Sequence, residues 1–488
     1  MLDSFIPSWA ELLRFMPEII LSLVGSLLVM LEPVTGPKSK SMLGHVAIAG
    51  LIVALGATFV AHANPGAAFS SMIVVDGFAT FFRVIVFTVG ILTIFSSYQY
   101  LDREGSNRGE YYALILFSVV GQSVMVVANE LIMIFIGLEI SSIATYVLAG
   151  FLRDDKRNNE SAIKYFLLGS FATGFLLYGI ALIYGATGTT DLGEVRQAVL
   201  QSAEPPVLLL SVAAGLMFIG LGFKVSGAPF QMWTPDVYQG APTPVTAFMS
   251  AGPKAAAFAI FLRIFVTVFE SVGDRWEPLI WASALASMTI GNFAALQQKN
   301  FKRLLAYSSI AHAGYVLVAL TARSEIGTAS AMFYLAAYAL MNMGAFAVIA
   351  HVAGKGETTV DVSDFAGLGA KQPVTAALLT IFMLSLIGVP LTGGFFGKFY
   401  IFKAALESKL LWLAILGLLN SAVAAYYYLR VLVVMYMEEP SARTENLEPM
   451  PMSLQAALWL PAAGVLFLGI FPSAVLEFAS ASARLLGQ

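Results

Sequence analysis

The sequence consists mainly of apolar runs that are long enough to cross a lipid bilayer as helices. A transmembrane helix needs about 20 mostly apolar residues, because each residue adds about 1.5 Å along the helix axis. Fourteen such runs lie within residues 12–31, 42–62, 75–99, 111–128, 131–151, 161–186, 207–234, 244–270, 278–297, 303–321, 328–352, 374–404, 410–436 and 454–478. The runs are too long for the alternating strands of a β-barrel. The sequence therefore predicts an all-α polytopic membrane protein with about fourteen transmembrane helices.

Composition excludes the other broad classes of protein. Of the 488 residues, 58% are apolar and 12% are charged, with 27 Lys and Arg against 30 Asp and Glu. Soluble domains carry roughly 25% charged residues, about twice this share. A soluble globular domain, a disordered chain and a nucleic-acid binder with a basic face are all incompatible with these values.

Side chains that usually hold metals or redox groups are scarce. The chain has no Cys, which removes disulfides, thiolate metal sites, iron–sulfur ligation and thiol catalysis. The four histidines, His45, His62, His312 and His351, are scattered singly, without the spacing that would place two of them on one helix face. We therefore expect no cofactor and no metal in this chain.

The basic residues of the loops predict an orientation in the membrane. We number the loops between the predicted spans in chain order. The odd-numbered loops carry thirteen Lys and Arg residues, namely Lys38, Lys40, Arg103, Arg108, Arg153, Lys156, Arg157, Lys299, Lys302, Arg303, Lys355, Lys371 and Arg443. The even-numbered loops and the C-terminus carry five, namely Arg196, Arg275, Arg323, Lys409 and Arg484. Because Lys and Arg concentrate in cytoplasmic loops, this asymmetry places the odd-numbered loops in the cytoplasm and both termini outside.

Three short motifs recur in the same order and indicate an internal repeat. Ser-Ser-Ile-Ala occurs at 141–144 and 308–311, and Gly-Ala-Pro-Phe at 227–230 is matched by Gly-Val-Pro-Leu at 388–391. Two further spans both begin with Ser-Ala-x-x-Tyr, at Ser161 and Ser330. The pairing predicts two units of five helices, and an odd number of helices makes successive units face opposite ways, as in transporters with inverted repeats.

The repeat divides the chain into four parts. These are residues 1–105 with helices 1–3, 106–272 with the first five-helix repeat, 273–440 with the inverted second repeat, and 441–488 with helix 14. Pro229 and the Pro390/Gly393/Gly394 cluster then fall in matching helices. Proline removes a backbone hydrogen bond, so both helices are expected to be interrupted near mid-membrane, where transporters bind their ions.

Several ionisable residues lie well inside the predicted spans. The clearest are Glu139, Lys224, Lys254 and Lys398, and His312 lies in the tenth span. A charge at the bilayer centre costs about 2.5–3.5 kcal/mol on insertion scales. Lys164, Lys302 and Lys403 lie nearer to helix ends. They are equally compatible with a functional role and with a structural one, in which they form helix–helix salt bridges or extend to the interface.

The excess of lysine over carboxylate among the central residues indicates proton exchange. One glutamate cannot neutralise three lysines, and burial disfavours a charged amine whereas a nearby carboxylate favours it. A lysine that alternates between the two environments changes its proton affinity by about 4 kcal/mol. Moving one charge against about 180 mV also costs about 4 kcal/mol. His312 is a candidate relay between Lys224 or Lys254 and Lys398, although a lone histidine is often only hydrogen-bonded.

Three stretches of the sequence resemble one known family along essentially the whole chain. They are residues 222–248, with Trp-Thr-Pro-Asp-Val-Tyr-Gln-Gly-Ala-Pro at 233–242, residues 302–315 with Ala-Tyr-Ser-Ser-Ile-Ala-His, and residues 385–400 with Gly-Val-Pro-Leu-Thr-Gly-Gly-Phe-Phe-Gly-Lys. The sequence is similar to the antiporter-like membrane subunits of respiratory complex I, NADH:quinone oxidoreductase. Within that family, residues 233–242 resemble the subunit N branch, called subunit 2 in organelles.

The resemblance implies roles for individual residues. Glu139 matches the glutamate of the fifth helix that pairs with the lysine of the seventh helix, here Lys224. Lys254 matches the central relay lysine, and Lys398 matches the terminal lysine that the sister subunit M replaces with glutamate. Lys164 resembles a family lysine of the sixth helix and is a further possible relay.

The resemblance also implies a setting for the chain. It implies a proton-translocating subunit in the membrane arm of complex I, beside sister antiporter-like and small membrane subunits in a bacterial inner membrane. NADH oxidation, flavin, iron–sulfur clusters and reduction of ubiquinone or another quinone would belong to other subunits. Two alternatives stay open, namely a subunit of a multi-subunit cation/proton antiporter and a structural scaffold whose charges only lock helices together.

Overall fold

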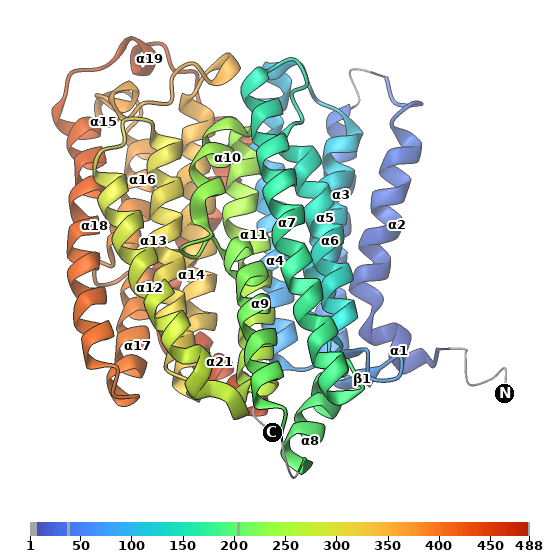
Figure 1. The fold of residues 1–488 in the computed structure, drawn as a ribbon. Coiled ribbons are helices and arrows are strands. Elements are labelled where there is room, and N and C mark those ends of the chain that lie inside the picture. Colours follow the sequence, from blue (N-terminus) through green and yellow to red (C-terminus); the bar gives the residue numbers. More distant parts are fainter. Residues whose placement is uncertain (1–6, 37–39, 203–204, 487–488) are drawn as a thin grey trace.

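The computed structural model describes residues 7–36, 40–202 and 205–486 and consists almost entirely of helices that run between two ends of the molecule (Figure 1). Within these described ranges, twelve helices are long and apolar enough to cross a membrane. Two shorter apolar helices, Met16–Leu31 and Pro373–Ile387, lie in the two remaining predicted spans. The predicted all-α polytopic fold is confirmed.

The N-terminal part is a group of helices with a small hairpin at one end. Its elements are α1 (Trp9–Arg14), α2 (Met16–Leu31), α3 (Lys40–His62), the antiparallel strands β1 (Gly66–Ala68) and β2 (Ile73–Val75), and α4 (Gly77–Glu104). The carboxylate of Asp76 caps the start of α4, and Gly105 ends this helix with φ +64°, a conformation that glycine adopts without strain. A fully buried ion pair, Arg83 Nη2 to Glu18 Oε1 at 2.7 Å, fastens α2 to α4.

The two predicted repeats contain corresponding helices. The first holds α5 (Gly109–Val127), α6 (Leu131–Ala149), α7 (Lys156–Thr187), α8 (Leu192–Gln201), α9 (Val207–Val225), η3 (Gln231–Trp233), α10 (Thr234–Gly240) and α11 (Thr243–Thr267). The second, preceded by η4 (Glu270–Val272), holds α12 (Gly273–Leu296), α13 (Phe301–Thr321), α14 (Glu325–Val352), α16 (Pro373–Ile387), α17 (Gly393–Glu407) and α18 (Leu411–Met437). The domain boundaries within the chain stay a prediction.

Close helix contacts at glycine occur at corresponding places in the two repeats. A Cβ atom on Gly121 of α5 would lie 2.6 Å from the carbonyl oxygen of Gly137 on α6. A Cβ atom on Gly291 of α12 would lie 2.7 Å from the carbonyl oxygen of Tyr307 on α13. Small residues let membrane helices approach closely, so α5 packs on α6 much as α12 packs on α13.

Both predicted interruptions are confirmed. In the seventh span, α9 ends at Val225 and the chain passes through irregular residues and η3 before α10 begins at Thr234. In the twelfth span, α16 ends at Ile387 and α17 begins at Gly393. Backbone groups freed by such breaks need new partners inside the membrane, and these partners include residues of the candidate site.

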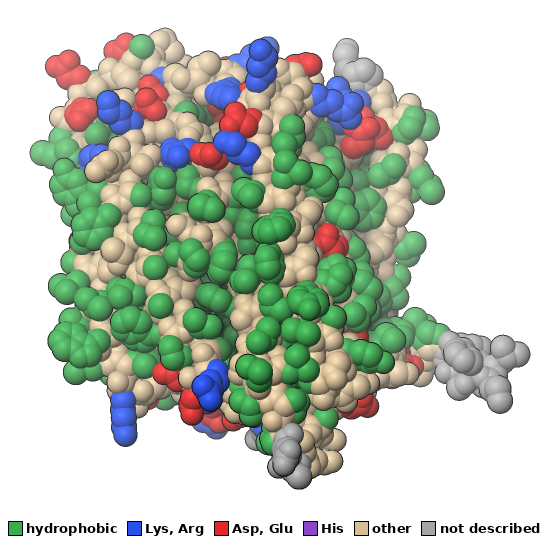
Figure 2. Space-filling view, in the orientation of Figure 1, with side chains coloured by type: hydrophobic (Ala, Val, Ile, Leu, Met, Phe, Trp, Pro, Cys, Tyr) green, Lys and Arg blue, Asp and Glu red, His purple; other side chains and the backbone are tan. Residues whose placement is uncertain are grey.

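The charged residues gather at the two ends of the molecule. In Figure 2, Lys and Arg concentrate at the upper end, whereas the middle of this face is mostly apolar. The upper end also carries the short elements η5 (Lys355–Glu357), η6 (Val362–Phe365), α15 (Leu368–Lys371) and α19 (Ala442–Glu445) (Figure 1). Lys38, counted among the basic loop residues, lies outside the described residues. Helices α1 and α21 both lie at the opposite end of the molecule (Figure 1).

The fourteenth predicted span is shorter than the apolar run suggests. Helix α20 (Met452–Ile470) ends before residue 478, and α21 (Pro472–Leu486) begins a separate helix. Proline at the first position of α21 removes a backbone donor and starts the new helix in another direction. Helix α21 packs against α4 and α14.

The most central helices are α11, α13 and α14. Their apolar segments are 94%, 94% and 89% buried, whereas those of α7 and α18 are 39% buried. Most polar residues within these apolar segments are therefore shielded from the surroundings by other helices. Residues of α6 and α7 instead reach the outer face of the chain.

Candidate functional site

The structure separates the lysines singled out from the sequence into two kinds. Lys224, Lys254 and Lys398, here called the lysine row, form no ion pair with a carboxylate of the described residues. Lys164 and Lys302 do form ion pairs, near the ends of their helices. Lys254 and Lys398 are 2% and 6% exposed, and Lys224 is partly buried.

Lys224 ends in a cradle of hydroxyl groups and aromatic rings. Its Nζ donates to Ser142 Oγ at 2.7 Å and to Tyr146 OH at 3.3 Å, both on α6. The same ammonium lies 5.1 Å from the ring centre of Tyr146 and 5.3 Å from that of Tyr165. Aromatic faces attract cations, so the cradle stabilises a charged lysine without any carboxylate.

The expected pair between Glu139 and Lys224 is not formed in this structure. Glu139 lies on α6 three residues before Ser142, which receives the hydrogen bond from Lys224 instead. The carboxylate is partly exposed at the outer face of α6, and its buried Oε1 atom has no hydrogen-bond partner among the described residues. Glu139 therefore keeps free capacity for another donor.

Lys254 is held by the second copy of the Ser-Ser-Ile-Ala motif. Its Nζ donates to the carbonyl oxygen of Ser309 at 3.1 Å and also to the hydroxyl group of Ser309 on α13. In the first copy of the motif, the matching serine is Ser142, which binds Lys224. The second serine of each copy thus accepts a hydrogen bond from a lysine of the row.

His312 lies one turn after Ser309 on α13 and contacts two tyrosines. Its Nδ1 forms a hydrogen bond with the hydroxyl of Tyr334, and its Nε2 lies 3.0 Å from the hydroxyl of Tyr428. The hydroxyl of Tyr428 also bonds to Ser308. Each of these hydroxyls and ring nitrogens can donate or accept, so the cluster can pass a proton by exchanging roles.

Lys398 is bound at the break between α16 and α17. Its Nζ donates to the carbonyl oxygens of Leu386 and Ile387, each at 2.9 Å, and to Ser421 Oγ at 2.9 Å. The ring centre of Tyr315 lies 4.8 Å from the same ammonium. Tyr315 follows His312 by three residues on α13, which brings the histidine cluster next to Lys398.

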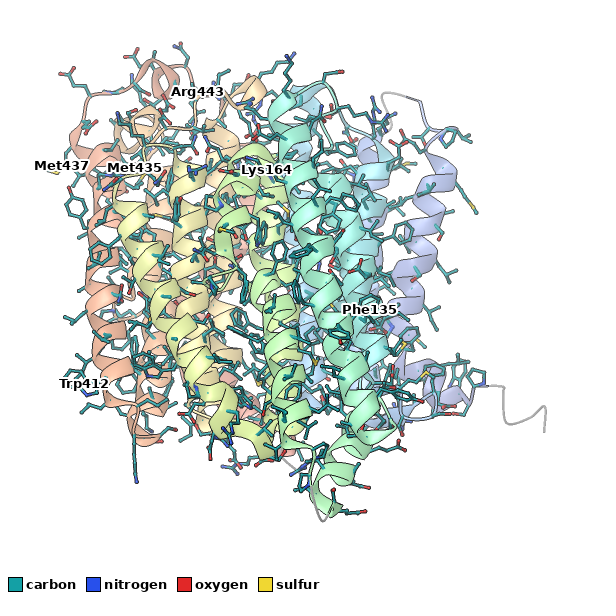
Figure 3. All side chains as sticks on the ribbon, in the orientation of Figure 1. Phe135, Lys164, Trp412, Met435, Met437 and Arg443 are labelled. Carbon is teal, nitrogen blue, oxygen red and sulfur yellow. The ribbon has the colours of Figure 1, made fainter. Side chains whose placement is uncertain are left out.

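Three lysines near helix ends have partners that agree with a structural role. Lys164 lies 2.8 Å from Asp236 and 2.6 Å from Glu160, and Figure 3 shows it near the upper end of α7. Lys302 is fully buried 2.5 Å from Glu357, and the half-exposed Lys403 lies 3.7 Å from Glu407. The structure does not bring Lys164 into the lysine row, and its possible relay role stays a prediction.

Several polar residues that complete the site were not identified from the sequence. They are the hydroxyl partners Ser142, Tyr146, Ser309, Tyr334 and Tyr428, together with Glu357. The repeated Ser-Ser-Ile-Ala motif contained a signal for the two serines, because a motif repeated around two buried lysines has a shared task. The tyrosines carried no such signal, since a buried tyrosine is common in any core.

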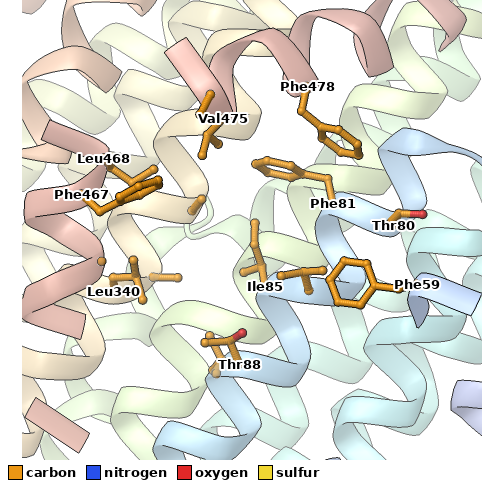
Figure 4. A pocket seen from close by; sticks show the side chains of 16 residues that line it. Phe59, Thr80, Phe81, Ile85, Thr88, Leu340, Phe467, Leu468, Val475 and Phe478 are labelled. Atoms are coloured by element: carbon orange, nitrogen blue, oxygen red, sulfur yellow. The ribbon is translucent and has the colours of Figure 1, made fainter. Parts of the chain in front are cut away.

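An apolar cavity lies apart from these residues. It has a volume of about 500 Å³ and lies between α4, α14, α20 and α21, lined by side chains such as Phe81, Leu340 and Phe478 (Figure 4). Its walls hold no titratable group, so it contributes nothing to proton transfer. Within the described residues, no three His, Asp or Glu side chains are placed to hold a metal ion. The expected absence of a cofactor stays a prediction.

Comparison with known sequences identifies close relatives. The profile of the family described as NADH:quinone oxidoreductase/Mrp antiporter, transmembrane, matches residues 128–424. NADH-quinone oxidoreductase subunit N 1 of Solibacter usitatus is 64% identical over 473 residues, covering 97% of each chain. NADH-quinone oxidoreductase subunit N of Trichlorobacter lovleyi is 48% identical over 471 residues, covering 96% of each chain.

Solved structures with the same fold include chains of respiratory complex I and of an Mrp complex. A chain of respiratory complex I from Thermus thermophilus with bound aureothin is 35% identical, with a TM-score of 0.80, covering 95% of this chain and 99% of that chain. A chain of the Mrp complex from a Dietzia species has a TM-score of 0.85 at 20% identity, covering 98% of both chains. The second likeness is a likeness of fold alone.

Proposed function

Because the chain belongs to the NADH:quinone oxidoreductase/Mrp antiporter transmembrane family, we propose that it is a proton-translocating subunit in the membrane arm of NADH:quinone oxidoreductase. Its partners are the other membrane-arm subunits, as the match to a chain of respiratory complex I supports. The subunit carries no cofactor of its own, and NADH oxidation and quinone reduction occur in other subunits. The Lys/Arg-rich end faces the bacterial cytoplasm, and both termini face the opposite side.

The observation that carries this proposal is the lysine row itself. Lys224, Lys254 and Lys398 lie inside the helical bundle and are held by hydroxyl and carbonyl groups rather than by carboxylates. An amine bound only to neutral groups can release its proton without leaving a carboxylate unpaired. Lysine suits this task because its amine exchanges protons, whereas an arginine remains protonated.

The contacts define a sequence of proton-holding groups. Lys224 exchanges its bond to Ser142 for Glu139, whose free carboxylate oxygen lies on the same helix. Lys254 passes its proton through the hydroxyl of Ser309 toward His312, which lies one turn further along α13. The hydroxyls of Tyr334 and Tyr428 flank the histidine and lead toward Lys398. The chain thereby provides polar groups from α6 to α18.

The change in proton affinity that a lysine can undergo is as large as the work needed to move a proton across the membrane. A lysine that moves between a carboxylate and a dry, unpaired environment changes its proton affinity by about 4 kcal/mol. Moving one charge against about 180 mV also takes about 4 kcal/mol. An exchange of Lys224 between the carboxylate of Glu139 and an unpaired state therefore involves enough free energy to move one charge against the membrane potential.

Substitution in the assembled complex tests the proposal. Lys224→Ala and Glu139→Gln are expected to assemble and to oxidise NADH, but with a lower number of protons moved for each electron. The measurement is NADH-driven proton uptake by the purified complex in liposomes. If a variant with Glu139, Lys224, Lys254 and Lys398 all replaced keeps the unaltered proton-to-electron ratio, the charges serve only as a scaffold.

A cation/proton antiporter subunit is the alternative within the same family. The family profile covers both kinds of protein, and the Mrp chain shares the fold. The relatives at 64% and 48% identity favour the complex I subunit. Sodium-dependent transport by the purified chain, without the other subunits of complex I, would support the antiporter instead.

A further inference from the structure

A buried ion pair lies where the loop after α14 meets the starts of α11 and α13. Lys302 Nζ lies 2.5 Å from Glu357 Oε2, and the two side chains are 0% and 8% exposed. The other carboxylate oxygen, Glu357 Oε1, accepts hydrogen bonds from the backbone N–H and from the hydroxyl of Thr243, each at 2.7 Å. Lys302 also donates to the carbonyl oxygen of Ala241 at 2.6 Å. Glu357 therefore contacts the first residue of α11 directly.

Glu357 also faces a polar pocket at the Lys/Arg-rich end of the molecule. The pocket has a volume of about 240 Å³. Its wall includes the charged side chains Arg157, Glu160, Lys164 and Asp236, and Glu357 is the buried carboxylate among them. The pair thus stands between a charged pocket on one side and the most buried helices on the other.

A stripe of polar residues runs from Glu357 along α11 to the lysine row. Thr243, Thr246, Ser250 and Lys254 follow one another at intervals of three, four and four residues, and all four are buried. Residues at these intervals lie on one face of a helix. The neighbouring helix α14 adds Asn342, whose side-chain amide donates to Ser250 Oγ at 2.8 Å.

The stripe has free hydrogen-bonding capacity near its middle. The Oδ1 atom of Asn342 is buried without a hydrogen-bond partner among the described residues. The same amide group donates to the hydroxyl of Tyr338 at 2.8 Å, and the ring of Tyr338 lies 5.1 Å from that of His312. Side chains three or four residues apart on a helix are about 5–6 Å apart, a gap that one water molecule bridges.

We propose that Glu357 is the proton-loading residue of this chain, which takes protons from the polar pocket and delivers them along the α11 stripe to Lys254. This inference rests on the proposed function and adds the residue through which protons reach the lysine row. A hydronium ion in the pocket gives its proton to the carboxylate and leaves water. The resulting carboxylic acid passes a proton through the hydroxyls of the stripe to the neutral amine of Lys254, which becomes an ammonium, and the carboxylate is restored.

The electrostatics of the pair fit this role. Burial alone raises the pKa of Glu357, but the Lys302 ammonium and the hydrogen bonds from Thr243 hold this pKa below its ordinary range. The carboxylate is therefore ionised at neutral pH, so it holds a proton only transiently before passing it on. The other titratable or charged groups that face the pair are Tyr100 and Glu104 of α4, Asp155 before α7 and Arg157 of α7.

The test compares two buried ion pairs in the assembled complex. Replacing both partners of a buried pair by neutral side chains of similar size often leaves stability unchanged, whereas removing one partner is costly. The test variant is Glu357→Gln with Lys302→Met. The matched control is Glu18→Gln with Arg83→Met, which neutralises the buried pair of α2 and α4 outside the stripe. Complex content in the membrane shows whether each variant assembles.

The expected result is a change in the pH profile of proton pumping in liposomes. The Glu357/Lys302 variant should pump at least about tenfold more slowly at neutral pH, because a positioned acid or base contributes roughly 10²–10⁴-fold to proton transfer. Its rate should fall further as the pH rises, since a lost proton collector matters most when protons are scarce. The Glu18/Arg83 control should keep the unaltered profile.

A second variant keeps the ion pair and interrupts the stripe. Thr246→Val with Ser250→Ala removes two hydroxyls and should reduce pumping in the same direction. If either test variant assembles and pumps with an unaltered rate and pH profile, the inference is overturned. If the Glu357/Lys302 variant fails to assemble, the pumping rate of the Thr246/Ser250 variant alone tests the inference. If Lys254→Met abolishes pumping while both test variants pump normally, only this inference fails. If Lys254→Met also pumps normally, the proposed function fails.

Discussion

The two interrupted helices bind their lysines in different ways. At the first break, the carbonyl oxygen of Phe223 accepts a hydrogen bond from Trp233 Nε1 at 3.0 Å. The loop is also fixed to α12, because Ala228 N donates to Ser287 Oγ at 2.7 Å. The freed backbone groups are thus satisfied without Lys224, and this lysine is left to the hydroxyls and rings of its cradle.

At the second break, the lysine satisfies the backbone itself. The carbonyl oxygens of Leu386 and Ile387, at the end of α16, accept hydrogen bonds from Lys398. With the bond to Ser421, Lys398 uses three donors. A lysine ammonium has three N–H donors and a neutral amine has two. Deprotonation of Lys398 therefore breaks one of its three hydrogen bonds. Lys224 donates only two hydrogen bonds, so it can keep both after deprotonation.

The difference teaches that one architecture can hold a mobile lysine and a structural one. Lys224 can leave Ser142 and Tyr146 for Glu139 without exposing a buried carbonyl group. Lys398 cannot move without leaving the end of α16 unsatisfied. We infer that the first break changes shape with little cost, and that the second break changes shape only when Lys398 changes its charge.

The largest effect is expected from removing Lys398. Lys398→Met leaves two buried carbonyl groups without a donor, at about 1–3 kcal/mol each. The variant should lose pumping and also lower the unfolding temperature of the complex. The control is Lys403→Met on the same helix, whose ion pair with Glu407 is exposed and worth about 0.2–0.5 kcal/mol. Equal unfolding temperatures for the Lys398→Met and Lys403→Met complexes would contradict a structural role for Lys398.

Removing Lys224 should separate pumping from stability. Lys224→Met leaves every freed carbonyl of the first break with its present partner. We expect proton pumping to be lost while thermal unfolding of the complex stays close to that of the unaltered protein. Calorimetry or fluorescence-detected unfolding provides the measurement. A loss of stability as large as that of Lys398→Met would contradict the comparison.

A substitution of Trp233 should make the first break resemble the second. Trp233→Phe removes the indole donor and leaves the carbonyl oxygen of Phe223 with the backbone N–H of Ser226 as its partner. The oxygen then has spare capacity to accept a bond from Lys224. We expect a moderate loss of stability, about 0.5–1.5 kcal/mol for the lost hydrogen bond, and pumping reduced several-fold. Trp459→Phe is the control, because Trp459 is 54% exposed on α20. If the Trp233→Phe and Trp459→Phe variants both pump at the unaltered rate, the hydrogen bond from the Trp233 indole has no effect on proton transfer by Lys224.

The smallest effect concerns how stability depends on acid pH at the ion pair between Lys302 and Glu357. The pKa of Glu357 is lowered in the folded protein, although burial alone raises it, because Lys302 and Thr243 bind the carboxylate. Its contribution to stability is complete above the ordinary carboxyl pKa and is lost as the pH falls below that range. Glu357→Gln should therefore flatten the decline of unfolding temperature in acid. The exposed Glu445→Gln should leave this decline unchanged, and equal slopes for all three proteins would contradict the assignment.

The sequence predicted the features that depend on local pattern. Apolar runs located the spans, and Pro229 with the Pro390 cluster located both breaks, because proline removes backbone hydrogen bonds wherever it falls. Lys224, Lys254 and Lys398 were identified because charge is costly in an apolar run. The end of the fourteenth helix was misplaced, since the apolar residues of α21 continue beyond Pro472.

Features that depend on distant partners could not be predicted in this way. Glu357 pairs with Lys302 across 55 residues, and its loop has no apolar pattern to mark it as buried. The choice of Ser142 over Glu139 as partner of Lys224 depends on a few ångströms of side-chain position on α6. The role of Lys398 as a cap on α16 follows from the backbone path at the break rather than from residue types.

The central claim is that the buried amines exchange protons during turnover, and infrared difference spectroscopy tests it most directly. The complex is labelled with ¹⁵N-lysine, and spectra are compared before and after addition of NADH. We predict ammonium bands that change during turnover, with part of the change missing in Lys254→Met. Lysine bands that stay constant while the complex pumps protons at its full ratio to electrons would contradict the account.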